Sequence, residues 1–390
     1  MKPTSSIPYA TQWIDEEDIL AVAEALRSAY LTQGPLVEEF EKKVAEYCGA
    51  RYAVAVNSGT SALHIACLAA GIKTGDEVIT SAITFAASAN CVLYCGGKPV
   101  FADIDPGTAL IEPADIRKKI TKKTKAVIPV HFAGHPADME EINKIAREKN
   151  LIVIEDAAHA IGARYKLMES NDWVKVGSCA HSDMTIFSFH AVKQLTTGEG
   201  GMVLTNNEAL YKKLILFRSH GITRDPSLLT FNQSPLTGPW YYEMQELGYN
   251  YRLTEIQCAL GLSQLKKLYE FISRRKEIAN IYDEAFAKME DIDYIREKQG
   301  FDSSRHLYVI LVNNREEVFN FLRKKANILV NVHYIPVYHH PYYQKLGYGR
   351  GLCPRAEEFY LRAISIPMFP KLTNDEVHYV IEKVRQALAD

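Results

Sequence analysis

The chain has 390 residues, of which 47% are hydrophobic and 24% charged, and its formal net charge at pH 7 is −2. This balanced composition excludes a strongly basic surface for nucleic acid or anionic lipid, and the length predicts two domains. The seven cysteines, an odd number scattered through regular segments, are typical of free thiols in a reducing compartment.

The first ten residues have neither the apolar region nor the cleavage-site pattern of a signal peptide, so we expect a cytoplasmic protein. Residues 78–97 carry no charge and are long enough to span a membrane. Hydroxyl and amide side chains interrupt that segment and would be costly in lipid, so a buried strand and helix explain it better. We therefore expect contact with neither membrane nor nucleic acid.

Apolar residues at helical spacing predict a helix over residues 14–30, and Pro35 suits the first turn of a second helix. From residue 51, short apolar runs alternate with helical patterns. The predicted strands are 52–56, 77–81, 99–104, 126–130, 151–155, 184–189 and 202–205, and the helices among them are 60–70, 85–94 and 138–148. This alternation predicts an α/β fold with a doubly wound, mostly parallel sheet.

The pattern changes after Leu253. A long helical pattern covers residues 252–287, and shorter strand candidates at 307–312 and 328–332 precede a last helix near 374–389. We therefore expect a large α/β domain over residues 1–260 and a small C-terminal α+β domain over residues 261–390.

Open α/β sheets bind ligands at the carboxyl ends of their strands, and several predicted strand ends carry unusual residues. Residues 57–61 (Asn-Ser-Gly-Thr-Ser) lead into a helix, where amides and hydroxyls can bind an anion, although plain helix capping is an equal explanation. Asp156 follows a buried apolar strand. Its carboxylate can pair with a protonated pyridine nitrogen, bind a metal or cap a helix.

Lys193 lies in a loop bounded by apolar strands and glycines, five residues after Ser188. Most lone lysines are solvated surface charges, but a desolvated lysine amine is a nucleophile that forms Schiff bases with carbonyl groups. Phe85 follows another strand and can stack on a planar cofactor, although a core phenylalanine is the commoner role.

Together these motifs resemble the DegT/StrS family of pyridoxal-phosphate (PLP) dependent sugar-nucleotide aminotransferases, a branch of the fold-type I aminotransferases. The resemblance runs through almost the whole chain and rests on residues 31–35 (Leu-Thr-Gln-Gly-Pro), 40–41, 57–62, 155–159, 188–193, 248–253 (Gly-Tyr-Asn-Tyr-Arg-Leu) and 333–336 (His-Tyr-Ile-Pro).

The resemblance implies that Lys193 holds PLP and later moves protons, and that Asp156 pairs with the pyridine nitrogen. His159 takes the position that contacts the ring or its 3-hydroxyl, where many members have glutamine. The remaining implied cofactor contacts are the phosphate with Ser58, Gly59, Thr60 and Ser188, and the ring face with Phe85.

Asn250 resembles the asparagine that reaches the cofactor phosphate of the neighbouring subunit, which implies a homodimer with shared active sites. The alternative is that Asn250 only caps the long helix that follows it.

Segments 80–105 and 187–201 resemble the corresponding segments of the family members that aminate C4 of a UDP-linked 4-keto-6-deoxy-N-acetylhexosamine. These members are the pseudaminic acid type. Their product is UDP-4-amino-4,6-dideoxy-N-acetyl-β-L-altrosamine. The implied amino donor is L-glutamate, with pyridoxamine phosphate carrying the amino group between the two half-reactions. A dTDP- or other nucleotide-linked keto-sugar is the alternative substrate.

The sequence argues against two other functions of the family fold and against one function outside it. A non-catalytic regulatory protein is expected to lose Lys193 or Asp156, and the family's sugar 3-dehydratases have histidine at the lysine position. A metal hydrolase could use the pairs at 131/135 or 339/340, but no carboxylate triad accompanies either pair, so we expect no metal.

Overall fold

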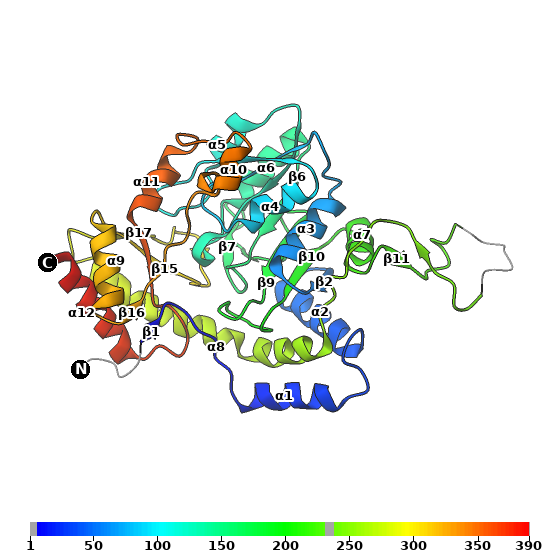
Figure 1. The fold of residues 1–390 in the computed structure, drawn as a ribbon, viewed down its shortest axis with the longest axis horizontal. Helices are drawn as coiled ribbons and strands as arrows, with labels where there is room; N and C mark the ends of the chain where they lie inside the picture. The colour runs from blue at the N-terminus through cyan, green and yellow to red at the C-terminus, as the bar shows by residue number, and fades with distance from the viewer. Residues whose placement is uncertain (1–5, 231–237, 390) are drawn as a thin grey trace.

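The computed structural model describes residues 6–230 and 238–389, and a seven-stranded sheet forms its centre (Figure 1). Its strands lie in the order β2-β10-β9-β6-β5-β3-β4. They are β2 (Tyr52–Val56), β3 (Glu77–Ser81), β4 (Lys98–Ala102), β5 (Thr124–Ile128), β6 (Ile152–Asp156), β9 (Met184–Ser188) and β10 (Gly201–Thr205). Strand β10 is antiparallel to both neighbours, and the other pairings are parallel. The predicted mostly parallel sheet is confirmed.

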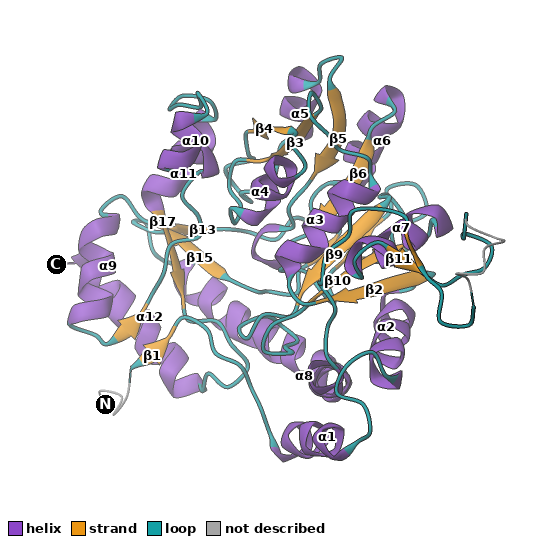
Figure 2. Cartoon of the chain, turned by 45° about the vertical axis from the view of Figure 1, so that its right-hand side comes forward, coloured by secondary structure: helices purple, strands orange, loops and turns teal. Residues whose placement is uncertain are grey.

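Helices cover both faces of this sheet because side chains on both sides of its strands are apolar (Figure 2). Along β2, Val54 and Val56 belong to one core, whereas Ala53 and Ala55 belong to the other. The first core is covered by α3 (Gly59–Ala69), α4 (Ala87–Tyr94) and α7 (Glu208–Arg218), and the second by α2 (Pro35–Cys48), α5 (Pro113–Lys119), α6 (Met139–Lys149) and α8 (Glu255–Phe286).

A separate apolar core lies at the C-terminal end of the chain, where the N-terminal strand also packs. Its sheet consists of β13 (Asp293–Tyr294), β15 (Tyr308–Leu311) and β17 (Ala363–Ile366), with β1 (Ile7–Pro8) paired to β16 (Ile328–Leu329) beside it, and its helices are α9 (Arg315–Lys324) and α12 (Asn374–Ala389). Within α8, the side chains move from the second core of the large sheet to this core between Ile272 and Ile278. The domain boundary at residue 260 stays a prediction.

The remaining elements lie around these cores. Helix α1 (Glu16–Arg27) packs along α8, and a hairpin of β11 (Ile222–Thr223) and β12 (Glu243–Met244) projects from the body beyond α7 (Figure 1). The others are β7 (Arg164–Lys166), β8 (Trp173–Lys175), β14 (Phe301–Asp302), α10 (Pro341–Lys345) and α11 (Pro354–Arg362).

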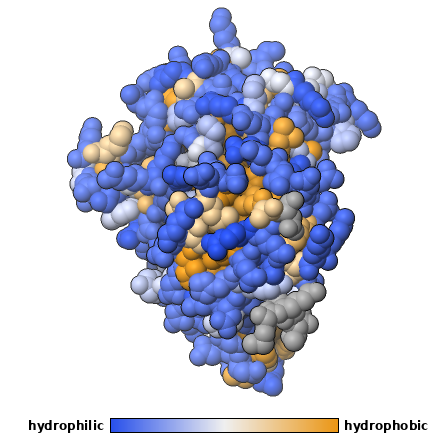
Figure 3. Space-filling view, turned by 90° about the vertical axis from the view of Figure 1, so that its left-hand side faces the viewer, coloured by the Kyte–Doolittle hydropathy of each residue, from blue (hydrophilic) through white to orange (hydrophobic). Residues whose placement is uncertain are grey.

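The face that carries α9 and α12 is mainly hydrophilic, with apolar atoms gathered in a strip across its middle (Figure 3). Within residues 6–230 and 238–389, no helix combines the length and the apolar character that crossing a membrane requires.

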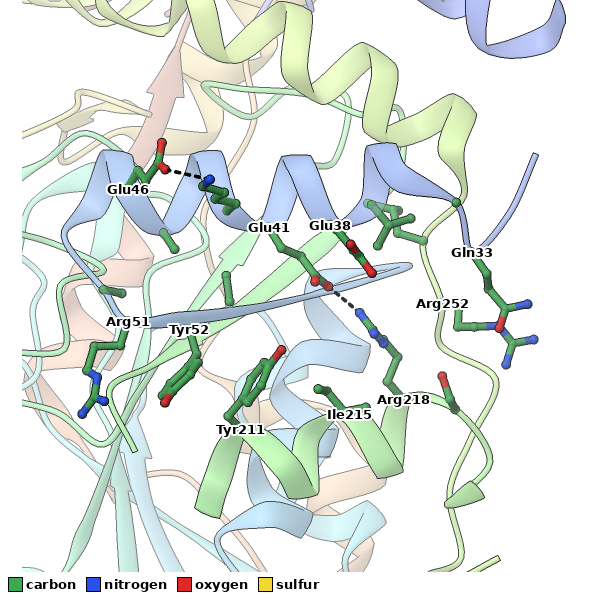
Figure 4. Close-up of a pocket in the computed structure, with 18 residues that line it drawn as sticks. Gln33, Glu38, Glu41, Glu46, Arg51, Tyr52, Tyr211, Ile215, Arg218 and Arg252 are labelled. Atoms are coloured by element: carbon green, nitrogen blue, oxygen red, sulfur yellow. Dashed lines mark hydrogen bonds and ion pairs between the residues drawn. The ribbon is translucent and has the colours of Figure 1, made fainter. Parts of the chain in front are cut away.

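The edge strand β2 is closed by an ion pair between two helices (Figure 4). Glu41 of α2 accepts a hydrogen bond from the N–H of Ala55 at 2.8 Å, and Arg218 of α7 donates to the carbonyl of the same residue at 3.2 Å. The ion pair therefore takes the place of a neighbouring strand at Ala55. Glu41 and Arg218 line a cavity of about 700 Å³, and none of the expected cofactor residues lines this cavity. Covering an edge in this way prevents pairing with another chain.

The N-terminus of α2 is capped by a carboxylate from a different helix. Glu255, the first residue of α8, is 1% exposed and accepts hydrogen bonds from the N–H groups of Gly34, Leu36 and Val37 at 3.0–3.1 Å. These are donors that a helix leaves unpaired at its first turn. A Cβ atom on Gly34 would lie 2.7 Å from the Glu255 carboxylate, so the glycine of the 31–35 motif permits this close approach.

We expect Glu255→Ala to lower the free energy of unfolding by about 3 kcal/mol, because three charge-assisted hydrogen bonds are lost at a buried site. Urea unfolding followed by circular dichroism, at one fixed protein concentration, measures the change. Glu39→Ala, at an exposed position of α2, is the matched control and should shift stability by less than about 0.5 kcal/mol. Equal unfolding midpoints for the two variants would contradict this role.

Candidate active site

The expected cofactor residues meet in one cavity at the carboxyl ends of the parallel strands. It has a volume of about 720 Å³, and its lining includes Ser58, Gly59, Thr60, Phe85, Asp156, His159, Ser188 and Lys193. Asp156 ends β6, Ser188 ends β9, and the 58–60 segment joins β2 to α3. The strand ends lie together because parallel strands align their carboxyl ends at one edge of a sheet. Asn250 lies outside this lining.

Asp156 provides a buried negative charge. It is 5% exposed, and its two carboxylate oxygens accept hydrogen bonds from Ser88 Oγ at 2.5 Å and from the Ala158 N–H at 3.2 Å. Both of these donors are neutral. Since a buried charge is costly without a partner, the carboxylate suits a cationic group of a ligand, such as a protonated pyridine nitrogen.

The neighbouring acid, Glu155, points to the opposite side of the sheet. Its carboxylate is 2.7 Å from His131 Nε2 and 2.9 Å from Thr185 Oγ1, and it also accepts a hydrogen bond from Ser182. Burial alone would raise the pKa of Glu155, but these hydrogen bonds outweigh burial and hold the pKa below its ordinary value. Glu155 therefore has its partners within the core, and of these two neighbouring acids it is Asp156 that lines the cavity.

Lys193 lies in the loop after β9 and is half-buried. Burial lowers the pKa of its amine to about 8, with a smaller lowering by the charge of Arg275 and an opposing rise from Asp156. An amine with this pKa is partly neutral near physiological pH and can act as a nucleophile or a base.

The helix α3 directs its N-terminus at the cavity. Ser58 caps this helix by accepting a hydrogen bond from Ser61 N at 3.0 Å, so the capping alternative is correct for its side chain. Helix N-termini also attract anions through their free N–H groups, which Gly59 and Thr60 carry here. A Cβ atom on Gly201 of β10 would lie 2.4 Å from the Ser58 carbonyl oxygen, so this glycine allows the loop to approach the sheet closely.

His159 packs against a second histidine that the sequence did not indicate, with the two rings tilted by 40°. Its ring centroid is 4.3 Å from that of His306, and its Nε2 lies 3.2 Å from the Tyr334 hydroxyl. Burial holds the pKa of both histidines well below the ordinary value, with a further lowering from neighbouring positive charges. The Nδ1 atom of each is buried and has no hydrogen-bond partner in the described structure. This end of the cavity is thus polar but uncharged.

Further lining residues come from distant parts of the chain. Tyr9, His306, His333 and Tyr334 join the cavity from the N-terminal segment and the C-terminal region. The motif at 333–336 was a usable signal for two of them, whereas no local pattern marks Tyr9 or His306. Phe85 is 61% exposed at the cavity, 6.1 Å between ring centroids from Tyr334.

Asn250 is exposed and pairs its backbone with Ser219. It does not cap the long helix, because Thr254 is the cap and its side chain accepts a hydrogen bond from Gln257 N at 3.2 Å. The capping alternative for Asn250 is therefore wrong, and its contact with a neighbouring subunit stays a prediction.

The histidines of the 131/135 pair considered for a metal have other roles. His131 accepts a hydrogen bond from Ala137 N at 2.9 Å besides contacting Glu155, and His135 Nε2 accepts one from Lys298 N at 3.1 Å. In the part of the chain that the structure describes, no group of three or more histidine, cysteine or acidic residues could hold a metal ion.

Comparisons with known proteins find similarity over almost the whole chain. The model of the DegT/DnrJ/EryC1/StrS aminotransferase family matches residues 12–385. A UDP-4-amino-4,6-dideoxy-N-acetyl-beta-L-altrosamine transaminase from Campylobacter jejuni is 40% identical over 97% of this chain and 99% of its own length. Among solved structures, Helicobacter pylori PseC, an aminotransferase involved in the biosynthesis of pseudoaminic acid, has a TM-score of 0.89 at 34% identity, covering 99% of this chain and 100% of that chain.

A sugar aminotransferase from Streptococcus pneumoniae, solved in a PLP form and a PMP form, is also similar over almost the whole chain. Its PLP form has a TM-score of 0.89 at 31% identity, covering 98% of this chain and 99% of that chain.

The lowered pKa of Lys193 makes a direct prediction for the cofactor-free protein. Acylation of this amine should reach half of its maximal rate near pH 8, whereas an unperturbed lysine has a pKa of about 10.4. Brief labelling with acetic anhydride at a series of pH values, followed by peptide mass spectrometry, gives the midpoint. Asp156→Asn should move the midpoint lower, since the Asp156 charge raises the pKa of Lys193. A midpoint near 10 in the unmodified protein would contradict the site's electrostatics.

Proposed function

Because this chain belongs to the DegT/DnrJ/EryC1/StrS aminotransferase family, we propose that it moves an amino group from L-glutamate to C4 of a UDP-linked 4-keto-6-deoxy-N-acetylhexosamine. The family makes it a PLP-dependent transaminase, and similar structures hold the cofactor in both its PLP and PMP forms. The amino donor and the individual sugar are the parts that we propose.

The residues of the cavity fit this cofactor. A buried carboxylate with only neutral donors, a lysine amine of lowered pKa and a helix N-terminus line the same space. The presence of both Asp156 and Lys193 in the lining of one cavity is the observation that carries the proposal. When bound, PLP supplies a ring that withdraws electrons from the bonds next to the substrate's nitrogen.

Lys193 is assigned two tasks. With the cofactor bound, its neutral amine would be the nucleophile that holds it, and the same Nζ atom, once freed, would take a proton from the substrate carbon and give a proton up again. A pKa of about 8 suits both tasks. Near neutral pH part of the amine is neutral and can act as a nucleophile or base, and the protonated form is acidic enough to give its proton up again. One base therefore serves both half-reactions.

Asp156 is assigned the partner of the ring nitrogen, and His159 the residue beside the ring. Asp156 balances a positive charge in a site that excludes water. His159 stays neutral because its pKa is well below the ordinary value, so it does not compete with the ring nitrogen for the Asp156 charge.

The phosphate is assigned to the N-terminus of α3. Gly59 and Thr60 supply backbone N–H groups there, and hydroxyls of Ser58, Thr60 and Ser188 line the same region. Phe85 is assigned to the ring face. These roles follow from the family resemblance and are supported by the shared cavity.

The sugar assignment is supported by the Campylobacter relative, which is named for UDP-4-amino-4,6-dideoxy-N-acetyl-beta-L-altrosamine, and by the Helicobacter structure, which is described as involved in the biosynthesis of pseudoaminic acid. A dTDP- or other nucleotide-linked keto-sugar is the alternative substrate. A non-catalytic regulatory protein would not need the amine and the carboxylate that line this cavity together.

We also propose a cytoplasmic homodimer with shared active sites. The projecting hairpin exposes large apolar side chains, with Trp240, Met244 and Leu247 between 65% and 76% exposed. Such a cluster on a surface is typical of a contact with another chain. All seven cysteines are free thiols, in keeping with a reducing compartment.

The substrate proposal is tested by incubating the purified protein with L-glutamate and a panel of UDP- and dTDP-linked 4-keto sugars. We expect 2-oxoglutarate to accumulate fastest with the UDP-linked 4-keto-6-deoxy-N-acetylhexosamine, and mass spectrometry should find the C4 amine. Lys193→Ala is the control and should lower turnover by at least about a thousandfold, because both proton transfers lose their base. Faster turnover of a dTDP-linked sugar would overturn the substrate assignment.

The shared-site proposal is tested by mixing two inactive variants, Lys193→Ala and Asn250→Asp, the second adding a carboxylate that repels the cofactor phosphate. If Asn250 serves the neighbouring subunit, each mixed dimer has one site with both defects and one with neither. Activity should then return to about a quarter of the wild-type level after subunit exchange. No recovery, with mixed dimers demonstrated by native mass spectrometry, would show that Asn250 acts within its own chain.

A further inference from the structure

The buried carboxylate of Asp156 is contacted by one of two hydroxyl groups that are hydrogen-bonded to each other. Ser88, in the first turn of α4, is fully buried, and its Oγ lies 2.5 Å from Asp156 Oδ2. Thr84 Oγ1, from the loop before α4, lies 2.7 Å from Ser88 Oγ. Neither hydroxyl has a part in the roles assigned above.

We propose that Ser88, oriented by Thr84, is a positioning residue that keeps Asp156 ionised and fixed for its pairing with the cofactor's ring nitrogen. The inference rests on the proposed function, and it deepens that function by naming what controls the charge of its buried acid.

The direction of the hydrogen bonds follows from the number of hydrogen atoms available. The Ser88 hydroxyl has one hydrogen and three acceptors in reach, the Asp156 carboxylate at 2.5 Å, Thr84 Oγ1 at 2.7 Å and the Phe85 carbonyl at 3.3 Å. The shortest bond, to a charged acceptor, is the strongest one. With its hydrogen on Asp156, Ser88 Oγ is left to accept from Thr84. The chain of donation therefore runs from Thr84 through Ser88 to Asp156, and a carboxylate receives it.

A protonated Asp156 would reverse this order. The acid would then donate to Ser88, and Ser88 would turn its hydrogen to Thr84 Oγ1 or to the more distant Phe85 carbonyl. With the acid ionised, both hydroxyls donate toward a charge, and charge-assisted hydrogen bonds are stronger than neutral ones. Hydrogen bonds to a carboxylate also lower its basicity, so a proton shared with a ring nitrogen stays on the nitrogen.

The fold holds this pair in place. Thr84 and Ser88 are four residues apart across the start of α4, so their side chains lie on the same side of that turn. Ala86, the residue at the helix cap, makes no side-chain hydrogen bond. The two hydroxyls are consequently free to serve Asp156 rather than the helix end.

The test measures the dissociation constant of pyridoxamine phosphate, which binds without a covalent bond to Lys193. We expect Ser88→Ala to weaken binding about tenfold, because a hydrogen bond to a buried charge is lost. In the Asp156→Asn background the same substitution should change the constant by less than about twofold, since the charge on which Ser88 acts is gone. Ser81→Ala is the matched control, as it removes a buried hydroxyl that has no hydrogen-bond partner in the described structure.

A second measurement reports the position of the proton. With ¹⁵N in the ring of pyridoxamine phosphate, the nitrogen signal of the Ser88→Ala protein should move toward the unprotonated value, and that of Ser81→Ala should stay with the wild type. If Ser88→Ala does not fold, Thr84→Val replaces it. This variant keeps the side-chain shape and should weaken binding about threefold by removing the donor to Ser88.

The inference is overturned if Ser88→Ala binds like Ser81→Ala, or if its effect is equally large in the Asp156→Asn background. The second result would mean that Ser88 only fills space. Failure of the wild-type protein to bind pyridoxamine phosphate at all would instead overturn the proposed function, and this inference with it. The wild-type measurement therefore separates the two failures.

Discussion

The buried carboxylate of Asp156 is the constraint on which the site depends. It ends an apolar strand at 5% exposure, and its two hydrogen-bond donors there are neutral. A charge in such a place is costly unless it has a positive partner, so the cavity is prepared for a cationic group of a ligand. In the same cavity, burial lowers the pKa of the Lys193 amine to about 8 and so favours its neutral, nucleophilic form.

The fold brings these groups together through the geometry of a parallel sheet. Alternation along β6 turns Asp156 toward the helices α3 and α4, whereas Glu155 turns toward His131 on the other face. Supporting contacts then fix the loops around the strand ends. Gly201 lets the loop before α3 lie close to β10, and Glu255 caps α2 from a different helix.

Much of this arrangement could be predicted from the sequence. The strands at 52–56 and 77–81 and the last helix lie where their periodicity placed them, and motifs at strand ends identified the lining residues Asp156, Ser188 and Lys193. Helix α7 was not predicted. The pairing of Ile7 with Ile328 was not foreseen either, because a short apolar run does not reveal its long-range partner. Tyr9 and His306 were missed for the same reason, since tertiary packing alone brings them to the cavity.

The central claim is that Lys193 and Asp156 hold one cofactor in this cavity, and reduction with borohydride tests it most directly. The purified protein loaded with PLP is reduced, digested and mapped by mass spectrometry. The reduced cofactor should be found on the peptide that contains Lys193, and Asp156→Asn should be labelled at the same lysine to a lower extent. Label on a different lysine, or none on the loaded protein, would contradict the account.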